Sequence, residues 1–142
     1  MLHQHQAVQE EGLAKRLPHL TPYEQTGLAT FINRLYQRYG TNLLRVILFG
    51  SKARGDFDAQ SDLDVLVVVS LPDNNYWQDW REIVDLAWDV GRTYGLVISS
   101  MVKNERDYAE MCAHQLLLAR NIERDGIRLW TTLPSAHTSQ PM

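Results

Sequence analysis

Cysteine is nearly absent from this chain of 142 residues, in which Cys112 is the only one. A disulfide needs two thiols, and a cysteine-type zinc site needs several, so neither can form within the chain. The scarcity of cysteine is typical of proteins that work in a reducing compartment. We therefore expect the protein to be cytoplasmic.

Long apolar runs are absent as well. The longest nearly uncharged run, residues 65–71, is far shorter than the roughly 20 residues that a membrane-spanning helix needs. Residues 1–15 hold Gln, His and Glu where a secretory signal would have an apolar stretch. These features predict a soluble intracellular protein without a membrane partner.

A strong net charge is the third absence. The formal charge is only -3 at pH 7. Nucleic acids recruit basic surfaces, so we do not expect nucleic acid as the main partner. The small excess of acidic residues is compatible with an enzyme that must recruit cations.

The length suits one domain, and no internal repeat or interdomain linker is visible. We divide the chain into an N-terminal extension (1–20), one folded domain (21–133) and a disordered tail (134–142). The helical pattern of the first 17 residues is weak, so this segment is either frayed or docked on the domain. His3 and His5 in this segment are more typical of solvated polar residues than of metal ligands.

Hydrophobic periodicity and capping signals predict alternating helices and strands. The expected order is helix 21–40, strand 43–49, strand 63–69, helix 73–94, strand 96–102 and helix 104–126. Thr21, Pro22 and Glu24 form a capping box at the first helix start, and Asp73 can cap the second helix. His114 marks a potential break in the last helix, and residues 127–131 are either a final strand or a terminal extension. The fold class is α+β, with a short mixed sheet flanked by helices.

The helix predicted over 73–94 carries two apolar stripes. One consists of Tyr76, Trp80, Ile83, Ala87, Val90 and Tyr94, and the other of Trp77, Val84, Trp88 and Gly91. Together they are wider than packing on one sheet requires. Either the sheet and a neighbouring helix bury both stripes, or one stripe is an interface with a partner or a second copy.

Two carboxylates open the strand predicted over 63–69. Asp62 and Asp64 are two residues apart, and side chains at this spacing point to the same face of a strand. Neighbouring carboxylates repel each other unless a proton or a cation lies between them. Magnesium takes oxygen ligands and is commonly held by one or two carboxylates together with substrate phosphates. The pair therefore predicts a magnesium site.

Gly50 and Ser51 follow the preceding apolar strand. Glycine permits a sharp turn and a close approach of a ligand, and a serine at the start of a helical turn presents its hydroxyl and free backbone N–H groups. Phosphate oxygens bind to such a turn. We therefore expect Gly50 and Ser51 to contact phosphates.

Lys52 and Arg54 add positive charge to the same turn. They are either further phosphate contacts or surface charges paired with Asp56 or Asp58. The sequence favours neither alternative.

The whole stretch resembles the signature of the nucleotidyltransferase superfamily related to DNA polymerase β. Ten residues separate Gly50-Ser51 from Asp62-x-Asp64, with Ala53-Arg54-Gly55 and Ser61 in their usual places. The nearest resemblance is to the minimal single-domain members, the MNT proteins. Residues 94–99 and 120–126 also resemble the third strand and the C-terminal helix of those proteins.

This resemblance implies roles for the central residues. Asp62 and Asp64 would hold two magnesium ions that bridge the triphosphate of ATP, and Gly50 and Ser51 would bind its outer phosphates. Ser61 would belong to the nucleotide-binding site, with Lys52 and Arg54 as further candidates for it.

The segment 96–102 departs from the family pattern. Many active relatives carry a third carboxylate on this strand, where it helps to bind the catalytic metal and to activate the acceptor hydroxyl. This chain has Ser99 and Ser100 there and no acid. The general base is therefore unassigned.

By resemblance, we expect an AMP-transferring antitoxin that modifies a hydroxyl, such as that of a tyrosine, on a HEPN-type toxin. Helix 73–94 offers a docking surface for that partner or for a second copy of the chain. One alternative is a nucleotide-binding or toxin-binding module whose catalysis has been weakened by the missing acid. The other is a transferase that acts on a small molecule or an RNA end.

Overall fold

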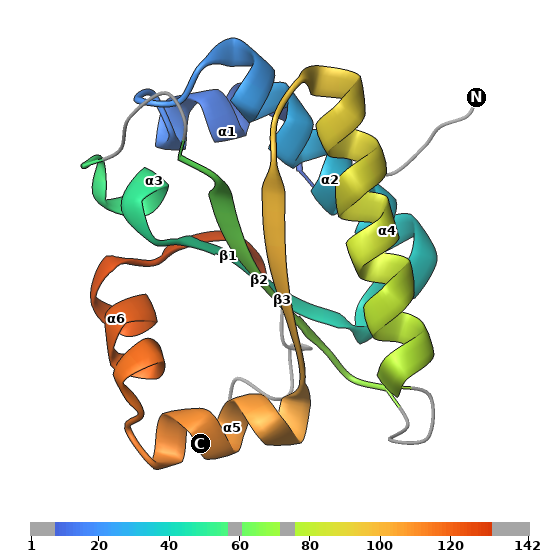
Figure 1. Ribbon diagram of the computed structural model, residues 1–142, viewed down its shortest axis with the longest axis vertical. Coiled ribbons are helices and arrows are strands. Elements are labelled where there is room, and N and C mark those ends of the chain that lie inside the picture. The colour runs from blue at the N-terminus through green and yellow to red at the C-terminus, as the bar shows by residue number, and fades with distance from the viewer. Residues whose placement is uncertain (1–7, 57–60, 72–75, 132–142) are drawn as a thin grey trace, which may run out of the picture.

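The computed structural model describes residues 8–56, 61–71 and 76–131. Their strands form one mixed sheet with the order β3-β2-β1-β4, shown in Figure 1. The strands are β1 (Leu43–Phe49), β2 (Leu63–Val69), β3 (Ile98–Asn104) and β4 (Ile127–Thr131). Strand β1 is antiparallel to β2 and β4, whereas β2 and β3 are parallel. The predicted α+β class is confirmed.

Helices flank this sheet on both faces (Figure 1). They are α1 (Glu10–Arg16), α2 (Pro22–Tyr39), α3 (Ser51–Arg54), α4 (Tyr76–Tyr94), α5 (Glu105–Ala113) and α6 (Leu117–Asp125), with a short 3-10 turn, η1 (Gly40–Asn42), after α2. The expected capping box is present, because the Thr21 hydroxyl accepts from the Glu24 N–H and Glu24 accepts from the Thr21 N–H. Among the described helices, none is both long and apolar enough to cross a lipid bilayer.

The strands predicted over 43–49 and 63–69 are observed with those bounds. Strand β3 begins two residues later than predicted, because the Leu96 N–H donates to the Gly91 carbonyl and so closes the end of α4. The expected break near His114 separates α5 from α6. Residues 127–131 pair with β1, so they are a strand and not a terminal extension. Asp73 lies outside the described residues.

Alternation along β2 divides the core into two clusters, since successive strand side chains point to opposite faces. Leu63, Val65, Val67 and Val69 belong to the larger cluster, which includes residues of α1, α2 and α4. Leu66 and Val68 belong to the smaller cluster, which includes residues of α5 and α6. The sheet is thus covered on both faces, with more apolar packing on one of them.

Helix α1 is docked, which decides between the two alternatives for the part of the N-terminal segment that is described. Leu13 and Leu17 are fully buried in the larger cluster. The Arg16 guanidinium donates to the carbonyls of Arg128 and Leu129 at 2.6 and 3.1 Å. Residues 8–20 therefore pack with the same core as α2. His3, His5 and the tail 134–142 lie outside the described residues.

Candidate functional site

Asp64 lies near the start of the central strand β2, between two neighbouring strands. Its Cα partners are Phe49 on β1 and Ser99 on β3. Burial raises the pKa of Asp64, the charge of Asp62 raises it further, and the charge of Arg54 lowers it in part. The structure therefore brings the two carboxylates close enough to repel each other.

Gly50 shapes the turn that faces this carboxylate. Its backbone has a φ of 78°, which is in the left-handed region that favours glycine. A Cβ atom at this position would collide with the Oδ2 atom of Asp64. Ser51 follows at the start of α3, a helix of only four residues. The turn can come this near to the carboxylate only because residue 50 has no side chain.

Lys52 forms a buried ion pair with the start of α2. Its side chain is 3% exposed, and its Nζ atom lies 2.5 Å from the Oε2 atom of Glu24 at the start of α2. The His19 ring donates to the Lys52 carbonyl at 2.7 Å. Among the described residues, Lys52 is therefore paired with Glu24 rather than with Asp56, and its contact with phosphate stays a prediction.

The ion pair with Lys52 affects the pKa of the Glu24 carboxylate. Burial raises the pKa of Glu24, but the hydrogen bonds from Lys52 and Thr21 outweigh burial and lower it below the usual value. The cation opposite Glu24 replaces the water that the carboxylate loses on burial.

Arg54 lies at the surface, unlike the buried Lys52. Its side chain is exposed, and its Nε atom lies 3.1 Å from the Oδ2 atom of Asp56, as the surface-pair alternative expected. Its charge also lowers the pKa of Asp64 in part, against the effects of burial and of Asp62. Asp58 lies outside the described residues.

Asp62 and Ser61 lie at the entrance to β2. Both line a groove of about 570 Å³ that also includes Glu24 and residues of α4. Asp62 borders a second hollow, of about 290 Å³, together with Trp88 and Ser99. Asp62 is thus open to solvent on the side of β3 and α4, whereas Asp64 is half-buried.

The register between β2 and β3 distinguishes the two serines at the position of the missing acid. Ser99 pairs with Asp64, and Ser100 pairs with Val65. Paired residues share a face of the sheet, so Ser99 stands beside Asp64 and Ser100 points toward the opposite face. Among the described residues, no cluster of three or more His, Cys, Asp or Glu could hold a metal ion.

The donor set at this edge fits magnesium. Asp62 and Asp64 offer carboxylate oxygens, and their mutual repulsion would be relieved by a small divalent cation. Two protein carboxylates are sufficient when water and substrate phosphates complete the octahedron.

Two structural features of this region are not signalled by local sequence patterns. Glu24 and His19 hold Lys52 from positions 28 and 33 residues away. A cavity between β1, α5 and α6 involves Tyr108 and Glu123. In the sequence, Glu24 is distinguished only by its place in a capping box, which does not indicate its pairing with Lys52.

A family model described as "Nucleotidyltransferase domain" matches residues 28–128. The chain belongs to the nucleotidyltransferase domain family. The resemblance seen in the central motif is thereby confirmed, and the chain is a nucleotidyltransferase by family.

Two similar nucleotidyltransferase relatives come from Methanocaldococcus jannaschii, and both carry the name "Putative protein adenylyltransferase". One is 34% identical over 82 residues, which are 58% of this chain and 75% of the relative. The other is 31% identical over 80 residues, which are 56% of this chain and 54% of the relative. A solved structure described as "Crystal structure of the toxin-antitoxin with AMP-PNP" is 20% identical, with a TM-score of 0.45, over 72% of this chain and 73% of that chain.

Proposed function

We propose that the protein is a magnesium-dependent adenylyltransferase, which moves AMP from ATP to a hydroxyl group. The observation that carries this proposal is the contact between Gly50 and Asp64. A turn without a side chain lies directly against a half-buried carboxylate that is repelled by its neighbour, Asp62. This arrangement accommodates a triphosphate and a cation side by side.

Each residue has a definite task in this proposal. Gly50 and Ser51 bind the outer phosphates, and Asp62 and Asp64 hold the magnesium. The bound metal would neutralise charge on the phosphates and on the leaving oxygen. The acceptor oxygen forms a bond to the α-phosphorus, and the bond from that phosphorus to the bridging oxygen breaks. Pyrophosphate leaves with the electron pair, and the hydroxyl proton passes to water.

The acceptor in this proposal is a hydroxyl on a HEPN-type toxin, which makes the protein an antitoxin. The resemblance of the central motif to the minimal nucleotidyltransferases supports this, and the name of the two relatives supports a protein as the acceptor. Helix α4 supplies a surface for such a partner or for a second copy. Trp77 and Trp88 on α4 are 73% and 66% exposed, so the stripe of which they are part is not buried within one chain.

A second candidate function is a nucleotide-responsive binding module. Ser99 favours it, because a serine stands beside Asp64 where many active relatives have a third carboxylate. A serine hydroxyl does not ionise near neutral pH, so it cannot replace an acid as a base.

Labelling with ATP carrying ³²P at the α-phosphate, in the presence of Mg²⁺ and a candidate toxin, tests the proposal. We expect label on the toxin with the wild type, and none with Asp62→Asn or Asp64→Asn. Glu11→Gln, on the exposed side of α1, is the carboxylate-to-amide control and should label normally, because it lies in neither the site nor the surface of α4. A tight complex without label would favour the binding module, and label on added RNA alone would show that the acceptor is not a protein.

A further inference from the structure

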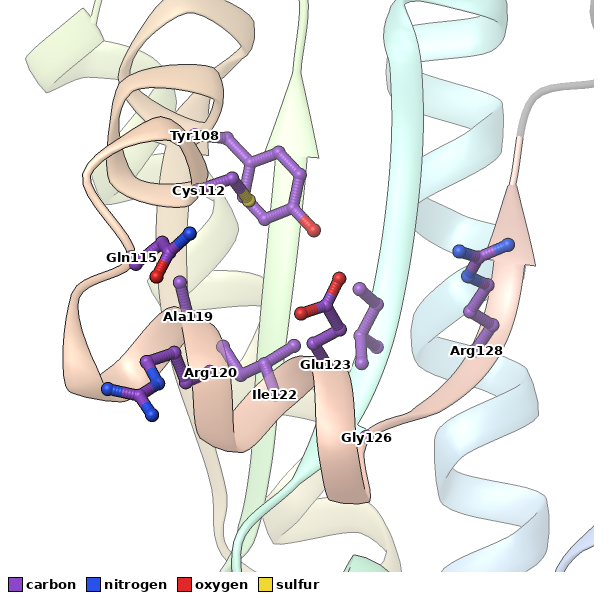
Figure 2. A pocket seen from close by; sticks show the side chains of 10 residues that line it. Tyr108, Cys112, Gln115, Ala119, Arg120, Ile122, Glu123, Gly126 and Arg128 are labelled. Atoms are coloured by element: carbon purple, nitrogen blue, oxygen red, sulfur yellow. The ribbon is translucent and has the colours of Figure 1, made fainter.

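A cavity of about 410 Å³ opens between the sheet and the last two helices (Figure 2). Its lining includes Ile47 of β1, Tyr108 and Cys112 of α5, Ile122 and Glu123 of α6, and Arg128 of β4. None of these residues belongs to the central motif. The volume lies within the range of small-molecule sites.

The cavity lies on the same face of the sheet as Asp64. Ile47 pairs with Leu66, which is two residues from Asp64 and therefore shares its face. Ile47 is two residues before Phe49, the partner of Asp64, which corresponds to about 7 Å along the strand. The order along β1 is thus the cavity, then the carboxylate, then the turn at Gly50.

The end of helix α6 lies between the cavity and the turn at Gly50 and Ser51. A Cβ atom on Gly126 would lie 2.9 Å from the Cγ2 atom of Ile47, so the end of α6 sits directly on β1. Ile47 is three residues before Gly50, at the end of the same strand. The end of α6 therefore contacts β1 within about 10 Å of strand length from the glycine turn.

The lining combines two apolar residues of the core with polar and charged groups, among them Gln115, Arg120, Glu123 and Arg128. Ile47 and Ile122 are apolar and buried. Figure 2 shows the Tyr108 hydroxyl and the Glu123 carboxylate pointing into the space between α5 and α6, with Arg128 on the opposite side. Burial raises the pKa of Tyr108, so its hydroxyl stays protonated at neutral pH. Within the described part of the chain, the Glu123 side chain makes no hydrogen bond or ion pair.

We propose that this cavity binds the nucleoside of the donor nucleotide, with the base against Ile47 and Ile122. Glu123 accepts a hydrogen bond from a ribose hydroxyl or from an exocyclic amino group of the base, and the Tyr108 hydroxyl donates to a ring nitrogen or oxygen. The linear order along β1 matches the order of base and sugar, α-phosphate and outer phosphates in a nucleoside triphosphate. This inference rests on the proposed function, because it assumes that the carboxylate pair binds the triphosphate.

The single cysteine allows a test on the unmodified protein. Cys112 is exposed and lines the cavity. Its thiolate attacks dithiobis-nitrobenzoate, forms a mixed disulfide and releases one thionitrobenzoate, which is followed by absorbance. With Mg²⁺ and the α,β-methylene analogue of ATP at ten times its dissociation constant, we expect the reaction to slow about tenfold. Mg²⁺ and tripolyphosphate, which lacks the nucleoside, should leave the rate unchanged.

Glu123→Gln provides a second readout by calorimetry. We expect it to weaken binding of the ATP analogue about tenfold, because the accepting oxygen loses its negative charge, and to leave tripolyphosphate binding unchanged. Glu110→Gln, on the exposed side of α5, is the matched control and should change neither affinity.

The outcomes separate this inference from the proposed function. If the analogue binds but gives no more protection of Cys112 than tripolyphosphate, the nucleoside is elsewhere and the inference is wrong. The same holds if Glu123→Gln leaves the affinity for the analogue unchanged, or weakens both ligands equally. If neither ligand binds the wild type, the proposed function fails and the inference fails with it.

Discussion

The two faces of the sheet differ in how they treat polar groups. On the face covered by α2 and α4, buried charges have partners: Lys52 is paired with Glu24, and Asp79 accepts from the Tyr39 hydroxyl. On the face covered by α5 and α6, Asp64 stands beside another carboxylate, and Glu123 borders a cavity. The first face stabilises the fold. The second face retains the repulsion between two carboxylates and an unfilled cavity, and a bound ligand would relieve both.

The same contrast occurs within one turn of chain. Lys52 and Arg54 are two residues apart, yet Lys52 is buried against α2 and Arg54 is exposed near Asp64. Lys52 fixes the turn to the start of α2, whereas Arg54 forms a surface pair with Asp56.

The largest expected effect comes from truncating matched isoleucines on the two faces. Ile32→Ala, in the larger cluster, should lower the free energy of unfolding by about 4 kcal/mol. Ile122→Ala, which borders the cavity, should cost only about 2 kcal/mol, because part of its surroundings is already empty. Urea denaturation of both variants measures the difference. Equal losses would show that the two faces are packed equally well.

Lys52→Met should destabilise the protein by about 3 kcal/mol, because it leaves the buried Glu24 carboxylate without its cation. The double variant with Glu24→Gln should recover part of this loss, since no buried charge then remains. Thermal unfolding of the single and double variants gives the comparison. A double variant less stable than Lys52→Met would contradict the assignment of the cost to an unpaired charge.

Asp64→Asn should have the smallest effect on stability. It should raise the free energy of unfolding, whereas the other substitutions lower it. The folded state raises the pKa of Asp64, so ionisation of this carboxylate opposes folding. Without Mg²⁺, the variant should be more stable than the wild type at pH 7. The gain should shrink as the pH falls through the raised pKa, and vanish below about pH 4, where the carboxylate is protonated in both states.

Magnesium gives the control for this variant. Added Mg²⁺ should stabilise the wild type and leave Asp64→Asn unchanged, as measured by the midpoint of thermal unfolding. If Asp64→Asn destabilises the metal-free protein at pH 7, the carboxylate is not under electrostatic strain.

What the sequence predicts well is local. Strands 43–49 and 63–69 follow from runs of β-favouring residues, and the start of α2 follows from the capping box at Thr21. The place of Asp64 next to Gly50 follows from the ends of two neighbouring strands.

What the sequence does not predict depends on distant partners. Lys52 and Arg54 have similar local settings, and the tertiary pairing of Lys52 with Glu24, 28 residues away, distinguishes the buried one from the exposed one. The cavity brings together β1 and α6, which are far apart in the sequence, so no local pattern places Glu123 near Ile47.

Glu24 divides its two oxygens between two structural tasks. Oε1 accepts from the Thr21 N–H at the start of α2, and Oε2 accepts from Lys52 in the turn after β1. The position of the glycine turn therefore depends on a helix start elsewhere in the chain. Anyone transplanting the motif 49–69 into another scaffold would have to carry this helix start with it, because the motif alone lacks its anchor.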